Sequence, residues 1–378
     1  MKKNKIKRAI LSVFISIFVI ILTITLPFVG VKNSDDLHNI FSVFVGERPE
    51  YQGIIEVWNI DTFDGGSASK SSYLNLVAKA FEKKNKGIYV MIKNLSEYEC
   101  INLIQKGYYP DLFSCSYGVA SEIKDYIVPF LDVNDININE KLLNAGKIGN
   151  DAYGLAWCYG YYLLISSKNH LKNAGFYNKF GVEENSEFKL SDYAGFCGYE
   201  KQKPAKIITS LTYGINKYLL PKYALYSYNN KGLNNSLDFA IDETVNNSTS
   251  YDAYTKFLSG ASVMLLGTQR DEVRINGRVE SGKLDGVIME KITSFTDLIQ
   301  YIFLAKGDNY SRQKASTDFV KLIFSAEYQS KLYDIKLCST IDNKGDNSDT
   351  MSHITSDFIS NCMVNNVFIA KSEIYNLQ

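Results

Sequence analysis

Residues Gly65 to Ser71, GGSASKS, combine glycines, hydroxyls and a lysine in an order that two kinds of chemistry use. A phosphate loop needs a glycine-rich turn whose N–H groups cradle phosphate, followed by a Lys and a Ser or Thr that reach the outer phosphates and Mg²⁺. Lys70 and Ser71 match the end of that pattern, but Ser69 stands where a glycine is required. The match to a phosphate loop is therefore incomplete.

The same segment contains a Ser-x-x-Lys motif, Ser67 to Lys70. At the start of a helix, this spacing places the lysine one turn from the serine, where it helps to activate the hydroxyl in acyl-enzymes of the penicillin-binding type. Tyr228 to Asn230 could serve as a second element of that type, but the third, Lys-Thr-Gly or Lys-Ser-Gly, does not occur in the chain. A serine hydrolase or transpeptidase is kept as the enzymatic alternative.

The elements around this segment favour a third interpretation, the wall of a ligand cleft. Ile54 to Ile60 has the composition of a β-strand, and Lys70 to Lys84 is predicted to be a helix because Tyr73, Val77 and Phe81 recur at four-residue spacing. The loop between them therefore follows the carboxyl end of a strand, which is where open α/β sheets bind ligands. We expect this loop to contact a ligand.

The amino terminus is basic and then strongly apolar. Its basic residues are Lys2, Lys3, Lys5, Lys7 and Arg8. At 1.5 Å per helical residue, the apolar run from Ala9 to Val31 is longer than the roughly 30 Å core of a bilayer. The positive-inside rule places residues 1–31 as a cytoplasmic flank and signal-anchor helix, with the globular body extracellular after a linker at 32–52. Cleavage near Gly30 is the alternative, although no clear Ala-x-Ala site is present.

Composition predicts an ordinary globular body. Lys and Arg total 41, as do Asp and Glu, so no net charge favours nucleic acid or an anionic surface. The cysteines are Cys100, Cys115, Cys158, Cys197, Cys338 and Cys362. Their spacing does not fit a zinc site, and with 3 histidines in the chain we expect no metal site. Most of the cysteines are expected to be buried thiols.

Strands and helices are predicted to alternate along the chain. Strands are predicted at 54–60, 88–92, 108–114, 155–167, 261–266 and 298–305, and helices at 70–84, 97–106, from 168, from 251 and at 313–333. The strand–helix–strand–helix–strand order at the start is the signature of a parallel sheet.

Several short motifs occur in a fixed order along the chain. They are Gly107 to Phe113 (GYYPDLF), Tyr153 to Trp157 (YGLAW), Phe257 to Gly267 (FLSGASVMLLG) and Ser325 to Gln329 (SAEYQ). In this order they resemble the extracellular, periplasmic-type solute-binding proteins of ABC importers, in particular the sugar-binding family 1. The lipid-carrying cysteine that usually anchors that family is missing here, so the apolar run itself would be the anchor.

The resemblance implies an α/β fold of the periplasmic-binding-protein type II. Such a fold has two discontinuous α/β lobes around a hinge and a ligand cleft, and ligand binding closes the cleft. We predict lobe 1 at 53–154 and 285–330, and lobe 2 at 155–284 and 331–378, preceded by one transmembrane helix.

The resemblance also implies which residues bind the ligand. Sugars are held by aromatic faces and by polar groups that take hydroxyls in pairs. In the loops at strand ends the candidates are Phe63, Asp64, Ser116, Trp157, Tyr159, Tyr213, Gln269, Arg270, Asp271 and Thr296.

The predicted function is capture of a small solute, expected to be an oligosaccharide, and its delivery to the membrane permease of an ABC importer. The resemblance implies no catalysis, no cofactor and no nucleic-acid partner. A ligand sensor with the same two-lobed fold is the non-enzymatic alternative.

Overall fold

The computed structural model describes residues 50–61, 63, 65–133, 135–173, 250–293, 296–341, 358–362 and 364–369, and the backbone of 207–209. The predicted signal-anchor at 1–31 and residues 32–49 of the predicted linker lie outside these residues, as do Asp64, Cys197, Tyr213 and Tyr228. Within the described ranges, none of the helices has both the length and the apolar character needed to span a bilayer.

The first sheet has six strands, with β2, β1, β3, β12 and β4 in that order and β7 also paired to β12. These strands are β1 Gly53–Ile60, β2 Ile88–Leu95, β3 Leu112–Cys115, β4 Ile127–Val128, β7 Gly154–Tyr159 and β12 Ile299–Ala305. β1 is parallel to both β2 and β3, which confirms the predicted parallel start. β12 is antiparallel to β3, β4 and β7.

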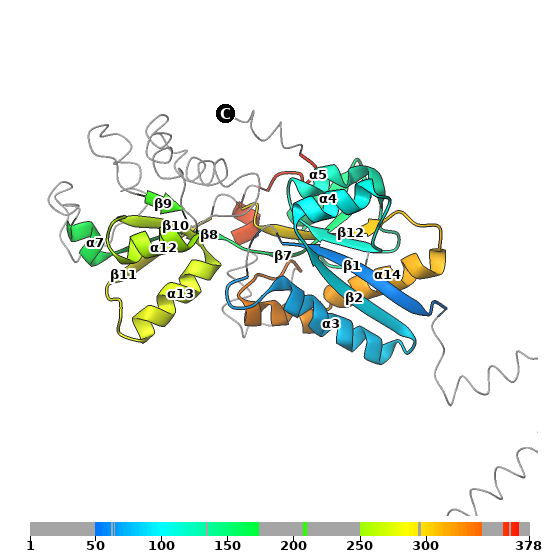
Figure 1. The fold of residues 1–378 in the computed structure, drawn as a ribbon, viewed down its shortest axis with the longest axis horizontal. Helices are drawn as coiled ribbons and strands as arrows, with labels where there is room; N and C mark the ends of the chain where they lie inside the picture. The colour runs from blue at the N-terminus through cyan, green and yellow to red at the C-terminus, as the bar shows by residue number, and fades with distance from the viewer. Residues whose placement is uncertain are drawn as a thin grey trace, which may run out of the picture. The chain divides into compact units, whose positions relative to one another are not determined.

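Helices cover both faces of this sheet. They are α3 Lys70–Lys84, α4 Glu97–Gln105 and α14 Tyr310–Ile323. The chain moves from β1 to β2 through α3 and then back across β1 to β3 through α4, so right-handed crossovers place α3 and α4 on opposite faces. Figure 1 shows α3 below and α4 above the strands. α14 packs on α3, where the Phe81 and Phe319 rings meet edge to face.

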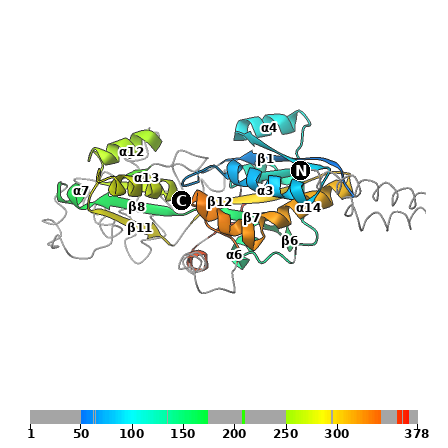
Figure 2. The same cartoon turned by 90° about the horizontal axis from the view of Figure 1, so that it is seen from below.

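The second sheet has four strands in the order β11, β8, β10, β9. They are β8 Tyr162–Ser167, β9 Ile207–Thr209, β10 Met264–Thr268 and β11 Val287–Ile292. α12 Ser250–Leu258 and α13 Gln269–Glu280 lie on the same side of β8 (Figure 2), and α7 Lys168–Asn173 follows β8.

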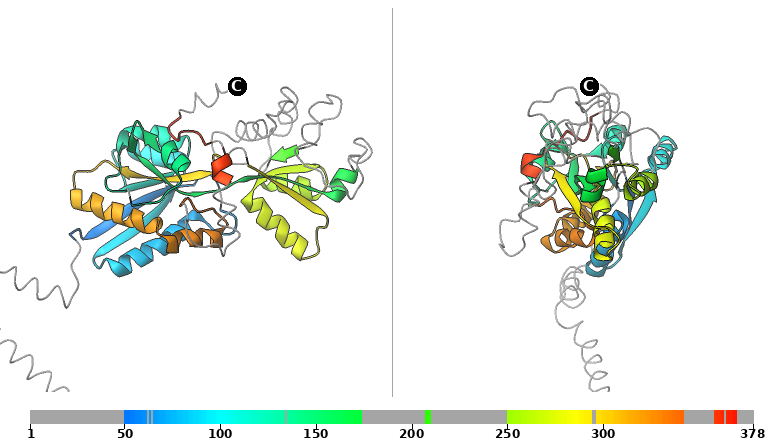
Figure 3. Two further views of the ribbon diagram at one scale, coloured as in Figure 1. Left: turned by 180° about the vertical axis from the view of Figure 1, so that it is seen from behind. Right: turned by 90° about the vertical axis from the view of Figure 1, so that its left-hand side faces the viewer.

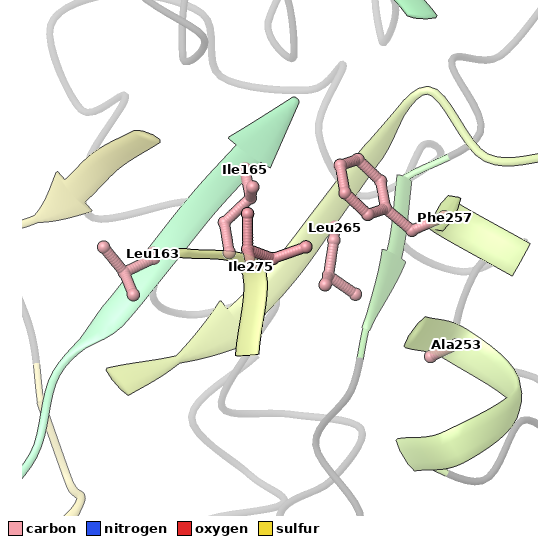
Figure 4. Packing of buried hydrophobic residues seen from close by; sticks show 6 residues of the cluster. All are labelled: Leu163, Ile165, Ala253, Phe257, Leu265 and Ile275. Atoms are coloured by element: carbon pink, nitrogen blue, oxygen red, sulfur yellow. The ribbon is translucent and has the colours of Figure 1, made fainter. Parts of the chain in front are cut away.

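A cluster of buried side chains joins this sheet to its helices (Figure 4). Leu163 and Ile165 from β8 and Leu265 from β10 meet Phe257 of α12 and Ile275 of α13. Because residues 163 and 165 are two apart on a strand, their side chains share one face, and both helices must cover that face.

Shorter elements complete the described chain. They are α5 Val119–Glu122, the 3₁₀ helix η1 Lys124–Tyr126, α6 Glu140–Ala145, β5 Lys147–Ile148, β6 Asp151–Ala152, α15 Ala326–Ser330 and the 3₁₀ helix η2 Lys331–Ile335.

The apolar run at 155–167 was predicted as one strand, and the structure divides it into β7 and β8 at Gly160 and Tyr161. β7 pairs with β12 in the first sheet, whereas β8 pairs with β10 and β11 in the second (Figure 3). The break follows from this change of partners. The chain returns to the first sheet between β11 and β12, where residues 293 and 296–298 are described.

The strand pairing differs from the predicted lobe boundaries in detail. Residues 155–159 belong to the first sheet, and β11 belongs to the second. Residues 358–362 and 364–369, predicted in lobe 2, contact α6 and the first sheet: Val367 N–H donates to the Ala145 carbonyl at the end of α6, and Phe368 packs edge to face on Phe303 of β12. The exact lobe limits stay a prediction.

The helix predicted over 313–333 is also divided, into α14, α15 and η2. Ser325 has extended backbone angles, φ −66° and ψ 147°, and so ends the helical path. The buried Gln329 amide donates to the carbonyls of Ile323 and Trp157, which satisfies the end of α14.

The five described cysteines, Cys100, Cys115, Cys158, Cys338 and Cys362, are buried and unpaired. Burial raises the pKa of each thiol, to about 12 for Cys100. The expectation of buried thiols is confirmed for these residues.

Phe257→Ala tests the core of the second sheet. The side chain is fully buried and its ring also meets His170 edge to face at 4.9 Å, so truncation should lower the free energy of unfolding by about 3–5 kcal/mol. Val279→Ala on α13, where the side chain is 40% exposed, is the control and should change it by less than about 0.5 kcal/mol. Urea unfolding followed by circular dichroism measures both; equal effects would contradict the assigned core.

Candidate functional site

The two glycines that suggested a phosphate loop are required by packing. A Cβ on Gly66 would lie 2.3 Å from Cβ of Lys336, and one on Gly65 would lie 2.2 Å from the Ala68 carbonyl oxygen. The N–H groups of Gly66 and Ser67 both donate to the Ile335 carbonyl, at 2.8 and 3.4 Å. These donors are directed at a protein carbonyl, so this geometry does not favour a phosphate loop.

The Ser-x-x-Lys motif is not arranged as in an acyl-enzyme. α3 begins at Lys70, and the Ser67 hydroxyl precedes the helix and donates to the Asp334 carbonyl at 2.7 Å. The Lys70 ammonium donates instead to the Phe63 carbonyl and pairs with Asp61. The lysine is therefore bonded to the Phe63 carbonyl and Asp61, and not to the hydroxyl that it would have to activate.

Phe63, predicted as a ligand contact, is packed against the protein. Its side chain is 5% exposed, and the Lys70 ammonium lies 3.5 Å from the centre of its ring. This arrangement is a cation–π contact within the chain.

Trp157 is buried in the first sheet rather than displayed at its edge. Its ring is fully buried, stacks on Tyr73 at 5.2 Å between centroids, and donates through Nε1 to the Ser114 hydroxyl. The register explains this placement, because Cys158 pairs with Gln300 and Ala156 with Tyr301, leaving Trp157 in a bulge.

Trp157 belongs to a chain of buried polar groups at the carboxyl ends of β1 and β3. The Ser114 hydroxyl donates to Asn59 and accepts from both Trp157 and Gln300. The Asn59 amide nitrogen in turn donates to the side-chain oxygen of Asn94 on β2. Hydrogen bonds of this kind fix the strand ends relative to one another.

Tyr159 and Ser116 are buried as well. Tyr159 is 1% exposed and its ring stacks on Phe358 at 6.0 Å with an interplanar angle of 7°. Ser116, after β3, is 2% exposed. Phe358 comes from the carboxyl-terminal segment and was not among the predicted site residues.

Gln269, Arg270 and Asp271 were predicted in a loop, but they form the first turn of α13. Thr268 and Asp271 make a capping box, in which Asp271 accepts the Thr268 N–H at 3.1 Å. The buried Gln269 amide accepts the Tyr161 N–H at 3.2 Å and fills the space beside Gly160. Gln269 and Asp271 therefore support the backbone, while Arg270 is half-buried.

Thr296 lies at the place where the chain passes between the sheets. Its side chain is fully buried, and its hydroxyl donates to the Gly160 carbonyl at 2.9 Å. The Gly160 N–H donates to the Leu298 carbonyl at 2.7 Å. We call Gly160, Tyr161 and Tyr162, from the end of β7 to the first residue of β8, the first crossing, and Thr296 to Leu298, before β12, the second crossing. These hydrogen bonds join the two crossings to each other.

A third hydrogen bond joins the same crossings. The Tyr162 hydroxyl donates to Asp297 at 2.5 Å. Burial raises the pKa of the Asp297 carboxyl to about 7, and Tyr117 and Cys362 are its other titratable neighbours. The two crossing segments therefore carry a titratable hydrogen bond.

A half-buried cluster beside these crossings has the chemistry of a sugar contact. The Tyr161 hydroxyl donates to Glu272 at 2.5 Å, and the Lys291 ammonium lies 4.3 Å from the centre of the Tyr161 ring. An aromatic ring, a carboxylate and an ammonium in one place can offer stacking and paired hydrogen bonds. We call Tyr161, Glu272 and Lys291 the Tyr161 cluster.

Sequence reasoning chose none of the residues of the Tyr161 cluster. Tyr161 lay within the strand predicted over 155–167 and next but one to the chosen Tyr159. Glu272 lies on α13 and Lys291 on β11, two elements that were not predicted. Asp64 and Tyr213 lie outside the described residues, so their ligand contacts stay predictions.

Neither a protein-family model nor a curated protein sequence matches the chain. Solved structures do match it. The GacH receptor of Streptomyces glaucescens, solved unliganded and with acarbose, has a TM-score of 0.56 at 14% identity, covering 86% of this chain and 90% of the receptor. The sugar-binding protein MalE of Xanthomonas citri has a TM-score of 0.56 at 13% identity, covering 85% and 88%.

The chain has the two-lobe α/β fold of maltose-binding proteins. A chitin oligosaccharide binding protein shares this fold, with a TM-score of 0.55 at 12% identity and coverage of 85% of this chain and 91% of that protein. Gly160 and Thr296 lie where this chain passes between its two sheets.

Asp297→Asn tests the titratable bond between the crossings. The folded pKa, about 7, lies above the usual 3.8, so the folded protein keeps a proton that the unfolded chain releases. Stability should therefore fall as the pH rises through the window between about 4 and 7. Asparagine cannot ionise and still accepts the Tyr162 hydroxyl, so the variant should lose less stability between pH 5 and pH 8 than the unaltered protein.

Melting temperatures across this pH range provide the measurement. Asp308→Asn, at an exposed position, is the matched control and should leave the pH dependence unchanged. An Asp297→Asn profile that follows the unaltered protein throughout would show that the Asp297 carboxyl does not titrate in this window.

Proposed function

We propose that this chain is a membrane-tethered extracellular solute-binding protein that captures a carbohydrate and delivers it to an ABC permease. The observation that carries the proposal is the fold shared over about nine-tenths of the length of several sugar-binding proteins. Those proteins are described as binding acarbose or chitin oligosaccharide, or as sugar-binding. Capture would occur by closure of the two lobes about the crossing segments.

The Tyr161 cluster supports a sugar as the captured solute. The Tyr161 ring lies in the first crossing, so a sugar that stacks on it would lie beside the hinge. Glu272 accepts and Lys291 donates hydrogen bonds, which suits neighbouring hydroxyl groups of a pyranose ring. In this proposal Tyr161 takes the stacking role that sequence reasoning gave to Trp157 and Tyr159.

The geometry of Ser67 and Lys70 lends no support to the serine acyl-enzyme. Their side chains bond to different carbonyl groups, those of Asp334 and Phe63. Binding without catalysis is therefore the function proposed, and no cofactor or metal takes part in it.

A melting-temperature screen tests carbohydrate capture. The protein is heated with maltotriose, chitotriose, mannotriose and lacto-N-biose, each at millimolar concentration. A sugar present at 100 times its Kd should add about 2.7 kcal/mol to the free energy of unfolding and so raise the melting temperature by several degrees. If none of these sugars, and no member of a wider carbohydrate panel, raises it, the proposed solute class is wrong.

The variant Tyr161→Ala then tests the location. It should weaken binding of the sugar that stabilises the unaltered protein, because a stacked ring contributes area and orientation. Tyr98→Ala on α4, where the side chain is 77% exposed, is the control and should bind normally. Normal sugar binding by Tyr161→Ala would show that the sugar does not bind at the Tyr161 cluster.

The membrane tether is tested by fractionating cells that make the full chain. If the run from Ala9 to Val31 anchors the protein, it should stay with membranes through a high-salt wash and be released by detergent. The same chain with residues 9–31 replaced by a cleavable secretory leader should appear in the medium. Release of the full chain without detergent would contradict the tether.

A further inference from the structure

Lys70, the first residue of α3, is a buried lysine beside the first sheet. It is 1% exposed, whereas lysine is almost never fully buried unless it is paired. Its ammonium donates to the Phe63 carbonyl at 2.5 Å, lies 3.5 Å from the centre of the Phe63 ring and is 3.4 Å from Asp61. All of these partners belong to the segment that joins β1 to α3.

We call the described part of this segment, Asp61, Phe63 and Gly65–Ser69, the β1–α3 loop. The loop is held on one side by Lys70, from the first residue of α3. On the other side, Gly66 and Ser67 donate to the carbonyls of Ile335 and Asp334. It is therefore fixed at both its start and its middle by groups outside it.

Only part of the charge on Lys70 is compensated. Asp61 is 38% exposed, so water screens its attraction for the ammonium. The Cys158 thiol is a neighbour, but burial raises its pKa, so it stays protonated and supplies no counter-charge. Burial is also the largest influence on Lys70 itself and lowers its pKa, which means that the charged form is disfavoured inside the fold.

A buried charge of this kind is weak evidence for a role in stability. Replacing a buried ionic group by an apolar one of similar shape is often neutral or stabilising. Met has nearly the length of Lys without its charge and would fill the same space beside Phe63. The lysine is better explained by what its directional bonds hold in place.

We propose that Lys70 is a positioning residue that fixes the β1–α3 loop in the conformation that contacts the ligand. The inference rests on the proposed solute-binding function and on the place of this loop after the carboxyl end of β1, where open α/β sheets bind ligands. Lys70 acts through the Phe63 carbonyl and Asp61 and does not itself touch the ligand. Its ammonium sets where the loop lies. Gly66 lets the loop approach Lys336 closely, and Gly65 leaves room for the Ala68 carbonyl oxygen.

The experiment compares Lys70→Met with two further variants of the full chain. Lys79→Met, at an exposed position on the same helix, controls for the loss of a lysine. Asp61→Asn removes the partner and leaves the buried ammonium without its carboxylate. Each protein is examined by melting temperature, by hydrogen exchange in peptides covering residues 61–69, and by binding of the sugar found in the melting screen.

Lys70→Met should melt within a few degrees of the unaltered protein but exchange faster at residues 61–69 and bind the sugar about tenfold more weakly, because misplaced contacts lose binding. Asp61→Asn should melt lower, since it strands a buried charge, and Asp61→Asn combined with Lys70→Met should recover that loss. Lys79→Met should match the unaltered protein in every measurement.

Two results would overturn the inference. Unchanged exchange at residues 61–69 in Lys70→Met would show that the lysine does not hold the loop. A large fall in its melting temperature, with exchange rising throughout the chain, would show a general structural role. Hydrogen exchange needs no ligand, so this arm decides the inference even if no sugar binds and the proposed function fails.

Discussion

The connection between the two sheets depends on the backbone of Gly160. Its N–H and C=O are both bonded to the second crossing, to the Leu298 carbonyl and the Thr296 hydroxyl. A Cβ at this position would lie 2.6 Å from Oε1 of Gln269, so only glycine leaves room for the amide that supports Tyr161. One residue without a side chain therefore lets the two crossings and the start of α13 meet.

The parts of the fold that the sequence predicted well are those where periodicity and burial agree. α3 has apolar residues at four-residue spacing and one buried face, and it begins and ends where it was expected. The first strands were recognised because glycines and polar loops separate them. Here local preference and tertiary packing point to the same structure, which is the condition under which a sequence is easiest to interpret.

The errors have equally definite causes. β7 and β8 are buried along their whole length, so no polar residue marks the change of sheet at Gly160. α13, QRDEVRINGRVE, has few apolar residues and contains Gly277, so its helical character is hidden until the Thr268 capping box is seen. β11 is half-buried along most of its length, and Lys291 within it could not be recognised as a neighbour of Tyr161.

The candidate site shows why residue type alone misleads. Polar residues at strand ends and helix starts were chosen as ligand contacts, but backbone groups need partners at these same places. Asp271 caps α13, and Thr296 joins the crossings. Aromatic residues were chosen because they could stack on a sugar, but the protein itself uses them for packing. Trp157, for example, lies in a bulge and stacks on Tyr73.

The position of β12 in the first sheet has a consequence for how the chain must fold. β12 pairs with β3, β4 and β7, strands that precede it by well over a hundred residues of sequence. The first sheet is therefore rich in contacts between distant parts of the chain, and such high contact order slows folding because long loops must close first. Until residues 299–305 are available, β3 and β7 have edges that await a partner, so a ribosome or a translocation channel that releases the chain from its amino terminus leaves these edges exposed until β12 emerges.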